Sequence, residues 1–172
     1  MFPTTENSTT DLATMLSQSA ITPTQTAGGK AFIRFDFETG DFDFGKDKID
    51  ITKEEIAVNT FSFKHGWTLW SNGKPTKKEV HFTQPLPPAM PSIGEDHPKE
   101  SRSFDAAFAD GDDAILSFGS SSYGGMKGCD ALLDEIAAKS AAGEKDFLFP
   151  VVKLTSESYA NAKRGGKLTY NP

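Results

Sequence analysis

Two tryptophans and several lysines stand close together in one stretch of this sequence. Residues 56–78 read IAVNTFSFKHGWTLWSNGKPTKK, so that Trp67 and Trp70 fall between Lys64 and the lysines at positions 74, 77 and 78. Aromatic rings stack on unpaired bases and ammonium groups neutralise phosphates, so this combination is suited to holding a single nucleic-acid strand. The same rings also suit a hydrophobic core, and both uses remain open at this point.

The periodicity of residues 56–70 separates the two tryptophans. The odd-numbered positions include the apolar residues Phe61, Phe63, Trp67 and Leu69. The even-numbered positions are largely polar and include Lys64, Thr68 and Trp70. Alternate side chains point to opposite faces of a strand. A long strand therefore places Trp67 in the core and leaves Trp70 as the candidate contact residue. The alternatives are a bent strand pair and a bulge at Gly66 that resets the faces.

A second group of cations lies in the segment 161–167, NAKRGGK. Its glycines allow a phosphate backbone to approach closely, although a solvated turn is the alternative interpretation. With the first group and two further tyrosines, the sequence offers one set of candidate binding residues: Lys64, Trp70, Lys74, Lys77, Tyr123, Lys127, Tyr159, Lys163, Arg164 and Lys167.

The stretch 119–124, GSSSYG, begins like a phosphate-binding P-loop, but Gly125 and Met126 stand where that motif needs Lys and Ser or Thr. Nucleotide hydrolysis is therefore not expected. The stretch instead offers Tyr123 as a stacking ring and Lys127 as a phosphate contact, with a simple turn into a helix as the alternative.

The sequence contains no convincing catalytic or metal-binding set. The three histidines are isolated, and the Asp pairs at 41/43 and 112/113 stand in turns, where Asp is common. Cys129 lies on the apolar stripe of a predicted helix and is interpreted as an inert core thiol. We expect no enzymatic activity, no cofactor and no metal.

The composition limits the class of protein. A chain of 172 residues with a single cysteine suits one domain, and its 14 Phe predict an aromatic core. The formal net charge of -6 argues against a uniformly basic nucleic-acid binder, but lysines and carboxylates are segregated along the chain. Without a leader or a long apolar run, we expect a cytoplasmic protein that does not enter a membrane.

Local patterns predict the elements. Residues 1–29 are polar and predict a flexible arm, and 30–172 form the domain. The alternation at 31–37 and 42–44 predicts a hairpin, within a segment at 30–50 that is added to the domain. Residues 79–83 predict a short edge strand, which a Pro-rich loop at 84–100 follows. Residues 102–109 and 114–118 flank a turn at 110–112. A Ser/Gly loop at 120–128 precedes a helix at 129–140, and strands follow at 147–155 and 167–170.

From residue 56 onward, this order is three strands, a helix and two strands. It is the order of an OB-fold, a five-stranded Greek-key barrel with one helix between its third and fourth strands. The sequence thus predicts a mainly β, OB-like barrel with an added N-terminal hairpin. A plain β-sandwich with one helix is the alternative.

The chain also resembles a family of small proteins encoded by tailed phages and prophages. The resemblance rests on a Gly-Trp-x-x-Trp-x-x-Gly-Lys-Pro signature at 66–75, an Asp/Gly hairpin at 35–46, a hairpin at 102–118, a Gly-rich loop and helix at 119–136, and a strand and basic loop at 151–170. Members continue the last strand beyond the position of Tyr170. The family is similar to phage single-stranded DNA-binding proteins with an OB-fold, which protect DNA in replication or recombination.

These observations lead to two hypotheses. The first is a sequence-tolerant single-stranded DNA-binding protein in the host-cell cytoplasm, with phage replication proteins as further partners and a homodimer formed through the N-terminal hairpin as a candidate assembly. The second is a non-enzymatic structural or protein-interaction phage protein, which the net charge of -6 favours. The preference between DNA and RNA, the number of nucleotides in a site and the oligomeric state are open.

Overall fold

The computed structural model describes residues 30–110, 114–144 and 148–172. The predicted arm at 1–29 and most of the turn at 110–112 lie outside the described residues. The described part is mainly β, as the sequence predicts, with one α-helix within it. Its elements are β1 (Ala31–Phe35), β2 (Phe42–Phe44), β3 (Ile49–Asp50), β4 (Glu55–Val58), η1 (Thr60–Ser62), β5 (Lys64–Ser71), β6 (Lys74–His81), β7 (Lys99–Phe108), β8 (Ile115–Ser120), α2 (Tyr123–Ala141), β9 (Val151–Lys153), β10 (Glu157–Asn161), η3 (Ala162–Arg164) and β11 (Lys167–Asn171).

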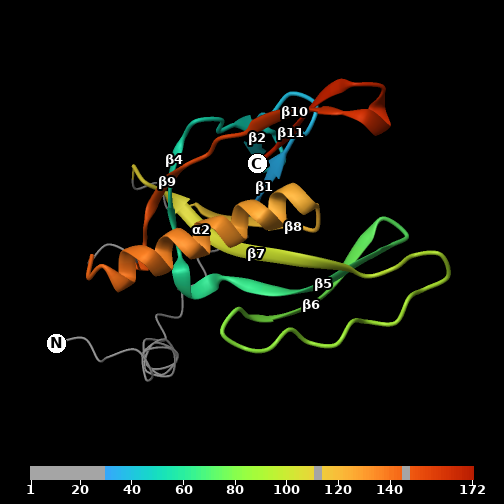
Figure 1. The fold of residues 1–172 in the computed structure, drawn as a ribbon, viewed down its shortest axis with the longest axis horizontal. Helices are drawn as coiled ribbons and strands as arrows, with labels where there is room; N and C mark the ends of the chain where they lie inside the picture. Colours follow the sequence, from blue (N-terminus) through green and yellow to red (C-terminus); the bar gives the residue numbers. More distant parts are fainter. Residues whose placement is uncertain (1–29, 111–113, 145–147) are drawn as a thin grey trace.

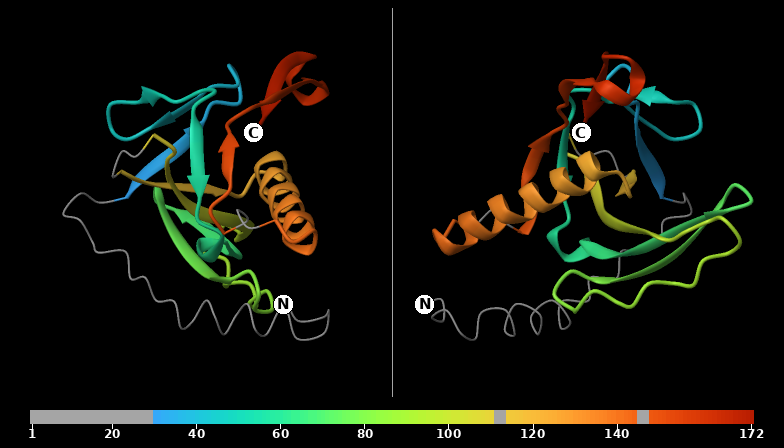
Figure 2. Two further views of the ribbon diagram at one scale, coloured as in Figure 1. Left: turned by 90° about the vertical axis from the view of Figure 1, so that its left-hand side faces the viewer. Right: turned by 45° about the vertical axis from the view of Figure 1, so that its right-hand side comes forward.

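Nine strands form one strongly curled sheet (Figures 1 and 2). The main path runs β3-β2-β1-β8-β7-β4-β9, and β5 pairs with both β7 and β6. The hairpin of β1 and β2 forms as predicted, with Ile33 opposite Phe44. It is part of the main sheet, because β1 also pairs in parallel with β8. A parallel pair between such distant segments leaves no turn signal in the sequence.

The core fills the concave side of the sheet with aromatic and branched side chains. Phe63 and Phe104 lie 5.0 Å apart between ring centroids, and Phe104 and Phe118 lie 5.4 Å apart. Ile56 and Leu116 are fully buried beside them. The helix α2 adds Cys129 and Ile136 to this core.

The predicted long strand at 56–70 is interrupted. The 3-10 turn η1 separates β4 from β5, and Asn59 caps that turn by accepting a hydrogen bond from the Phe61 backbone N–H. Pairing between β5 and β6 runs without a break from Lys64 opposite His81 to Ser71 opposite Lys74, so Gly66 makes no bulge. A Cβ on Gly66 would meet the Lys78 carbonyl oxygen at 2.1 Å, and glycine is therefore required by the close approach of β6.

The strand β6 begins earlier than the predicted edge strand at 79–83. Asn72 and Gly73 both have positive φ, 51° and 72°, and form a two-residue turn. Asn-Gly is the strongest short hairpin signal, and it accounts for the tight turn between β5 and β6. Pro75 is accommodated because β6 pairs only with β5 and is an edge strand.

The helix α2 begins at Tyr123, six residues before the predicted start, so the predicted loop at 120–128 is wrong over its last six residues. Ser122 caps the helix, and its hydroxyl accepts the Gly125 N–H at 3.1 Å. A Cβ on Gly125 would meet the Ser120 hydroxyl at 2.1 Å. Close packing on Ser120 therefore explains the glycine at position 125 in the first turn, where propensity alone predicts a loop.

The C-terminal segment differs most from the predicted barrel. The predicted strand at 167–170 is β11, but it pairs with β10 in a separate two-stranded sheet and not with the main sheet. The strand predicted at 147–155 is reduced to β9, which pairs with β4. The hairpin of β10 and β11 lies beside the turn that follows β1 (Figure 1), because Arg164 forms an ion pair with Glu38 and stacks over the Phe37 ring.

Candidate functional site

An open groove of about 1270 Å³ lies on the described surface. Its walls come from β1, β5, β6, β7, β8, the start of α2 and the hairpin of β10 and β11. The residues that line it are Phe32, Ile33, Arg34, Phe35, Phe37, Thr68, Trp70, Pro75, Lys77, Ser101, Phe118, Gly119, Ser120, Ser121, Ser122, Tyr123, Gly124, Tyr159, Asn161, Arg164, Thr169 and Pro172.

Five aromatic rings in this groove are exposed. The exposed fraction is 61% for Phe32, 52% for Phe37, 55% for Trp70, 79% for Tyr123 and 42% for Tyr159. Exposed large rings are normally scattered over a protein surface. Five of them around one concavity form a surface on which planar groups can stack.

The charged side chains that line the groove are all cations. Arg34, Lys77 and Arg164 line it, and among the described lining residues there is no Asp or Glu, although the chain has 24 acidic residues. Each cation has a carboxylate neighbour outside the lining: Asp43 for Arg34, Glu79 for Lys77 at 3.8 Å, and Glu38 for Arg164. These side chains are partly exposed, from 12% for Glu79 to 60% for Glu38, so an anion entering the groove would compete with the carboxylates for the cations.

The hairpin of β5 and β6 places Trp70 and Lys77 on the groove face. Trp70 lies opposite Pro75, and Thr68 lies opposite Lys77. The Thr68 hydroxyl is buried and donates to the Ser101 hydroxyl of β7 at 3.1 Å. This bond attaches the hairpin to the main sheet directly beneath the two groove side chains.

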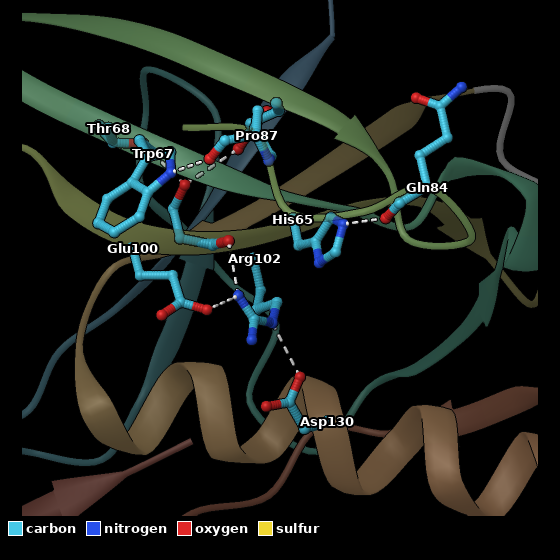
Figure 3. Close-up of polar contacts among 10 residues, drawn as sticks. His65, Trp67, Thr68, Gln84, Pro87, Glu100, Arg102 and Asp130 are labelled. Carbon is cyan, nitrogen blue, oxygen red and sulfur yellow. Dashed lines mark hydrogen bonds and ion pairs between the residues drawn. The ribbon is translucent and has the colours of Figure 1, made fainter. Parts of the chain in front are cut away.

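Trp67 lies on the other face and is not in the core, so the prediction of a core tryptophan is wrong (Figure 3). Its side chain is half-buried, and its Nε1–H donates to the Pro87 carbonyl at 2.6 Å. His65 Nε2 bonds the Gln84 carbonyl at 2.7 Å, and Lys78 Nζ donates to the Pro88 carbonyl at 2.9 Å. The Pro-rich segment thus covers this face of β5 and takes Trp67 away from any ligand in the groove.

An ion-pair network holds α2 against the sheet. The Arg102 guanidinium of β7 contacts Glu100 at 2.7 Å and Asp130 of α2 at 2.9 Å (Figure 3). Burial acts to lower the pKa of Arg102, but its hydrogen bonds with Asp130 and Glu100 outweigh burial, and the net pKa is raised. Arg102 therefore stays charged, and its ion pair with Asp130 anchors α2 to β7 about two turns after the start of the helix.

The structure brings five of the ten predicted site residues into the groove: Trp70, Lys77, Tyr123, Tyr159 and Arg164. The other five are exposed but do not line it: Lys64, Lys74, Lys127, Lys163 and Lys167. Lys163 and Lys167 flank Arg164 at the end of the β10 and β11 hairpin. Lys64 is six positions from Trp70 along β5, or roughly 20 Å. These five remain predictions as binding residues.

Sequence reasoning missed three groove residues, Phe32, Arg34 and Phe37. Phe32 and Arg34 have the parity opposite to Ile33 and Phe35, which pack in the core, so an exposed Phe at position 32 was foreseeable. Phe37 shares the core parity, but β1 ends at Phe35 and the turn that follows carries its ring outward.

The comparisons with known proteins give no match. No family model matches the chain, and neither a curated protein nor a solved structure does. The groove must therefore be interpreted from its own chemistry.

Two further observations concern the described residues as a whole. Their helix is not long and apolar enough to cross a membrane. No group of three or more His, Cys, Asp or Glu in this part of the chain is arranged to hold a metal ion.

Proposed function

We propose that this protein binds single-stranded nucleic acid in the groove, and that it acts as a sequence-tolerant single-stranded DNA-binding protein. The observation that carries the proposal is the combination of five exposed rings and three cations, with no carboxylate among the described residues of the groove lining. The family resemblance of the sequence adds DNA protection in phage replication or recombination, inside a host cell, to the same proposal.

The proposed chemistry needs only stacking and charge. Each base stacked on a ring contributes about 1–3 kcal/mol, and every base has a face that can stack, so the contact tolerates any sequence. Arg34, Lys77 and Arg164 would replace counterions on the phosphates. A phosphate entering the groove would replace Asp43, Glu79 or Glu38 as the partner of a cation.

We also propose that the curled sheet is a variant of the OB-fold. The bent pair β4 and β5 stands as a first strand, followed by β7, β8, α2 and β9 in OB order. OB-folds bind oligonucleotides on their second and third strands and on the loops that join strands 1 to 2 and 4 to 5. The groove is lined by β7, β8, the β6 insertion and the hairpin after β9, which correspond to those positions.

The direct test is a titration with oligo-dT, followed by tryptophan fluorescence and repeated over a salt series. The exposed Trp70 should be quenched, whereas Trp67, held against Pro87, should leave a residual signal. The logarithm of the binding constant should fall with the logarithm of the salt concentration, by about 0.7 for each phosphate neutralised. Absence of both quenching and salt dependence would refute DNA binding.

A protein-interaction role is the second candidate, because the net charge of -6 disfavours long-range attraction to nucleic acid and exposed rings also occur at protein interfaces. A partner held mainly by ring contacts would bind with little salt dependence. The same salt series therefore distinguishes the two candidates.

A further inference from the structure

We propose that the start of α2, together with Lys77 and Thr169, forms a subsite for one phosphate of the strand. This inference rests on the proposed function and specifies where in the groove the backbone of the strand is held. The bases would then extend from this point toward the rings of Tyr123 and Trp70.

The start of α2 is open toward the groove. Ser121, Ser122, Tyr123 and Gly124 all line it, and the helix continues for 19 residues. Its first turn contains no acidic side chain. The N–H groups and the dipole at such a terminus favour an anion.

The serine hydroxyls before α2 add a donor. Ser120 Oγ and Ser122 Oγ lie 3.0 Å apart, so one hydroxyl proton is used between them. Ser120 Oγ also accepts the Ser122 N–H at 3.2 Å, and Ser122 Oγ accepts the Gly125 N–H at 3.1 Å. The proton of the second hydroxyl is then free to be donated to a ligand, since each hydroxyl has one proton.

Lys77 brings a charge to the same wall. A Cβ built on Gly119 would lie 3.3 Å from Lys77 Nζ, so the ammonium group rests over the strand that leads into the serines. Its carboxylate neighbour, Glu79, is 3.8 Å away, which leaves donors of the ammonium group for a further acceptor.

Thr169 supplies an independent indication of a ligand. It lines the groove from β11 and is only 5% exposed, yet its Oγ1 has no hydrogen-bond partner among the described residues. A buried hydroxyl without a partner has a free-energy cost, because it has given up its hydrogen bonds to water. A phosphate oxygen in the groove would accept the hydroxyl proton and remove that cost.

The test is an amide NMR titration of the full chain with inorganic phosphate, at an ionic strength held constant with sodium chloride. We expect saturable shifts of the Ser122, Tyr123 and Gly124 amides. Lys77→Gln and Thr169→Val should each weaken the apparent phosphate affinity at least about threefold, the size of a weak hydrogen bond or ion pair. Lys153→Gln, an exposed lysine of β9 outside the groove, should change nothing.

Thr169→Val also separates a binding role from a structural one. Because the hydroxyl is unpartnered, Val should leave the free energy of unfolding unchanged or raise it, while phosphate binding weakens. Equal phosphate affinity in Lys77→Gln, Thr169→Val and the parent protein would overturn the subsite.

A parallel titration with oligo-dT distinguishes the subsite from the proposed function. If oligo-dT binds but leaves these three amides unshifted, the subsite is wrong and the proposed function stands. If inorganic phosphate shifts them and oligo-dT does not bind, the strand-backbone subsite is overturned together with the proposed function, and only a site for a free phosphate compound remains.

Discussion

Trp67 and Trp70 lie three residues apart on β5 and have different surroundings. Parity in the sequence separated them, and the structure places Trp70 in the groove with 55% of its surface exposed. The partner of Trp67 could not be predicted in the same way. It is the carbonyl of Pro87, in a segment without regular periodicity that packs over β5.

Trp70 is the ring whose removal is most informative. We expect Trp70→Ala to lower the affinity for oligo-dT by about 5- to 150-fold, which corresponds to about 1–3 kcal/mol for one lost stacking contact. Its free energy of unfolding should change by less than about 0.5 kcal/mol, because the side chain is exposed. Anisotropy of a labelled oligo-dT measures the affinity without relying on tryptophan emission.

Phe149→Ala is the matched control for that variant. Phe149 is 50% exposed, contacts Phe61 and lies outside the groove lining. It should leave oligo-dT binding unchanged. Equal losses in the two variants would mean that the groove is not the binding surface.

Cys129 permits a chemical test of the core. Burial raises the pKa of its thiol to about 12, and the neighbouring Asp130 carboxylate acts in the same direction. Because only the thiolate reacts, iodoacetamide at about pH 8 should leave the folded protein unmodified and label it rapidly in denaturant. Mass spectrometry measures the extent of labelling over time. Rapid labelling of the folded protein would contradict the burial of this helix face.

At the scale of elements, the edge strand β6 ends in His81, whose contribution to the free energy of unfolding depends on pH. Burial lowers the pKa of His81 below its ordinary value of 6.5, a hydrogen bond with the Phe61 backbone opposes this, and the nearby charges of Lys64 and His65 act with burial. The unfolded chain therefore binds a proton more readily than the folded chain. The stability that His81 contributes is present above about pH 6.5 and is lost as the pH falls through that value.

We expect the free energy of unfolding to be lower at about pH 5.5 than at about pH 7.5, and His81→Asn to reduce that difference. Urea denaturation at the two pH values measures it. An unchanged pH dependence in His81→Asn would show that the ring is not held in a partly buried site between Phe82 and Thr83.

The elements also show where sequence patterns succeed. The hairpins and the C-terminal two-thirds of the helix follow from alternation, turn residues and helical spacing, which are local signals. The start of α2 was missed because Gly124 and Gly125 lower helix propensity, and the packing of Gly125 on Ser120 is visible only in the fold. Likewise, β10 was missed because its residues are exposed and carry no apolar alternation.

At the scale of the whole molecule, the mainly β class was predictable and the order of the strands in the sheet was not. The parallel pairing of β1 with β8 joins segments more than 80 residues apart, and neither strand contains a signal for the other. The groove depends on this pairing, because the pairing places Phe32 and Arg34 in the same groove as Trp70 and Tyr123. Composition predicted rings and cations, but only the fold selects which of them share a surface.

The charge distribution also belongs to this scale. A net charge of -6 argues against nucleic-acid binding when it is averaged over the surface. The groove lining has three cations and, among its described residues, no carboxylate, although a carboxylate outside the lining pairs with each cation. Binding should therefore be short-ranged and strongly salt-dependent, since screening removes the local attraction.

The most direct measurement for the central claim is photo-crosslinking to an oligo-dT in which one thymine is replaced by 5-iodouracil, with peptide mapping by mass spectrometry. It reports both whether a strand binds and where. The proposed function predicts crosslinks to the groove rings, foremost Trp70, Tyr123 and Tyr159, which disappear when unlabelled oligo-dT competes. No crosslink, or crosslinks to Phe149 and other rings outside the groove, would contradict it.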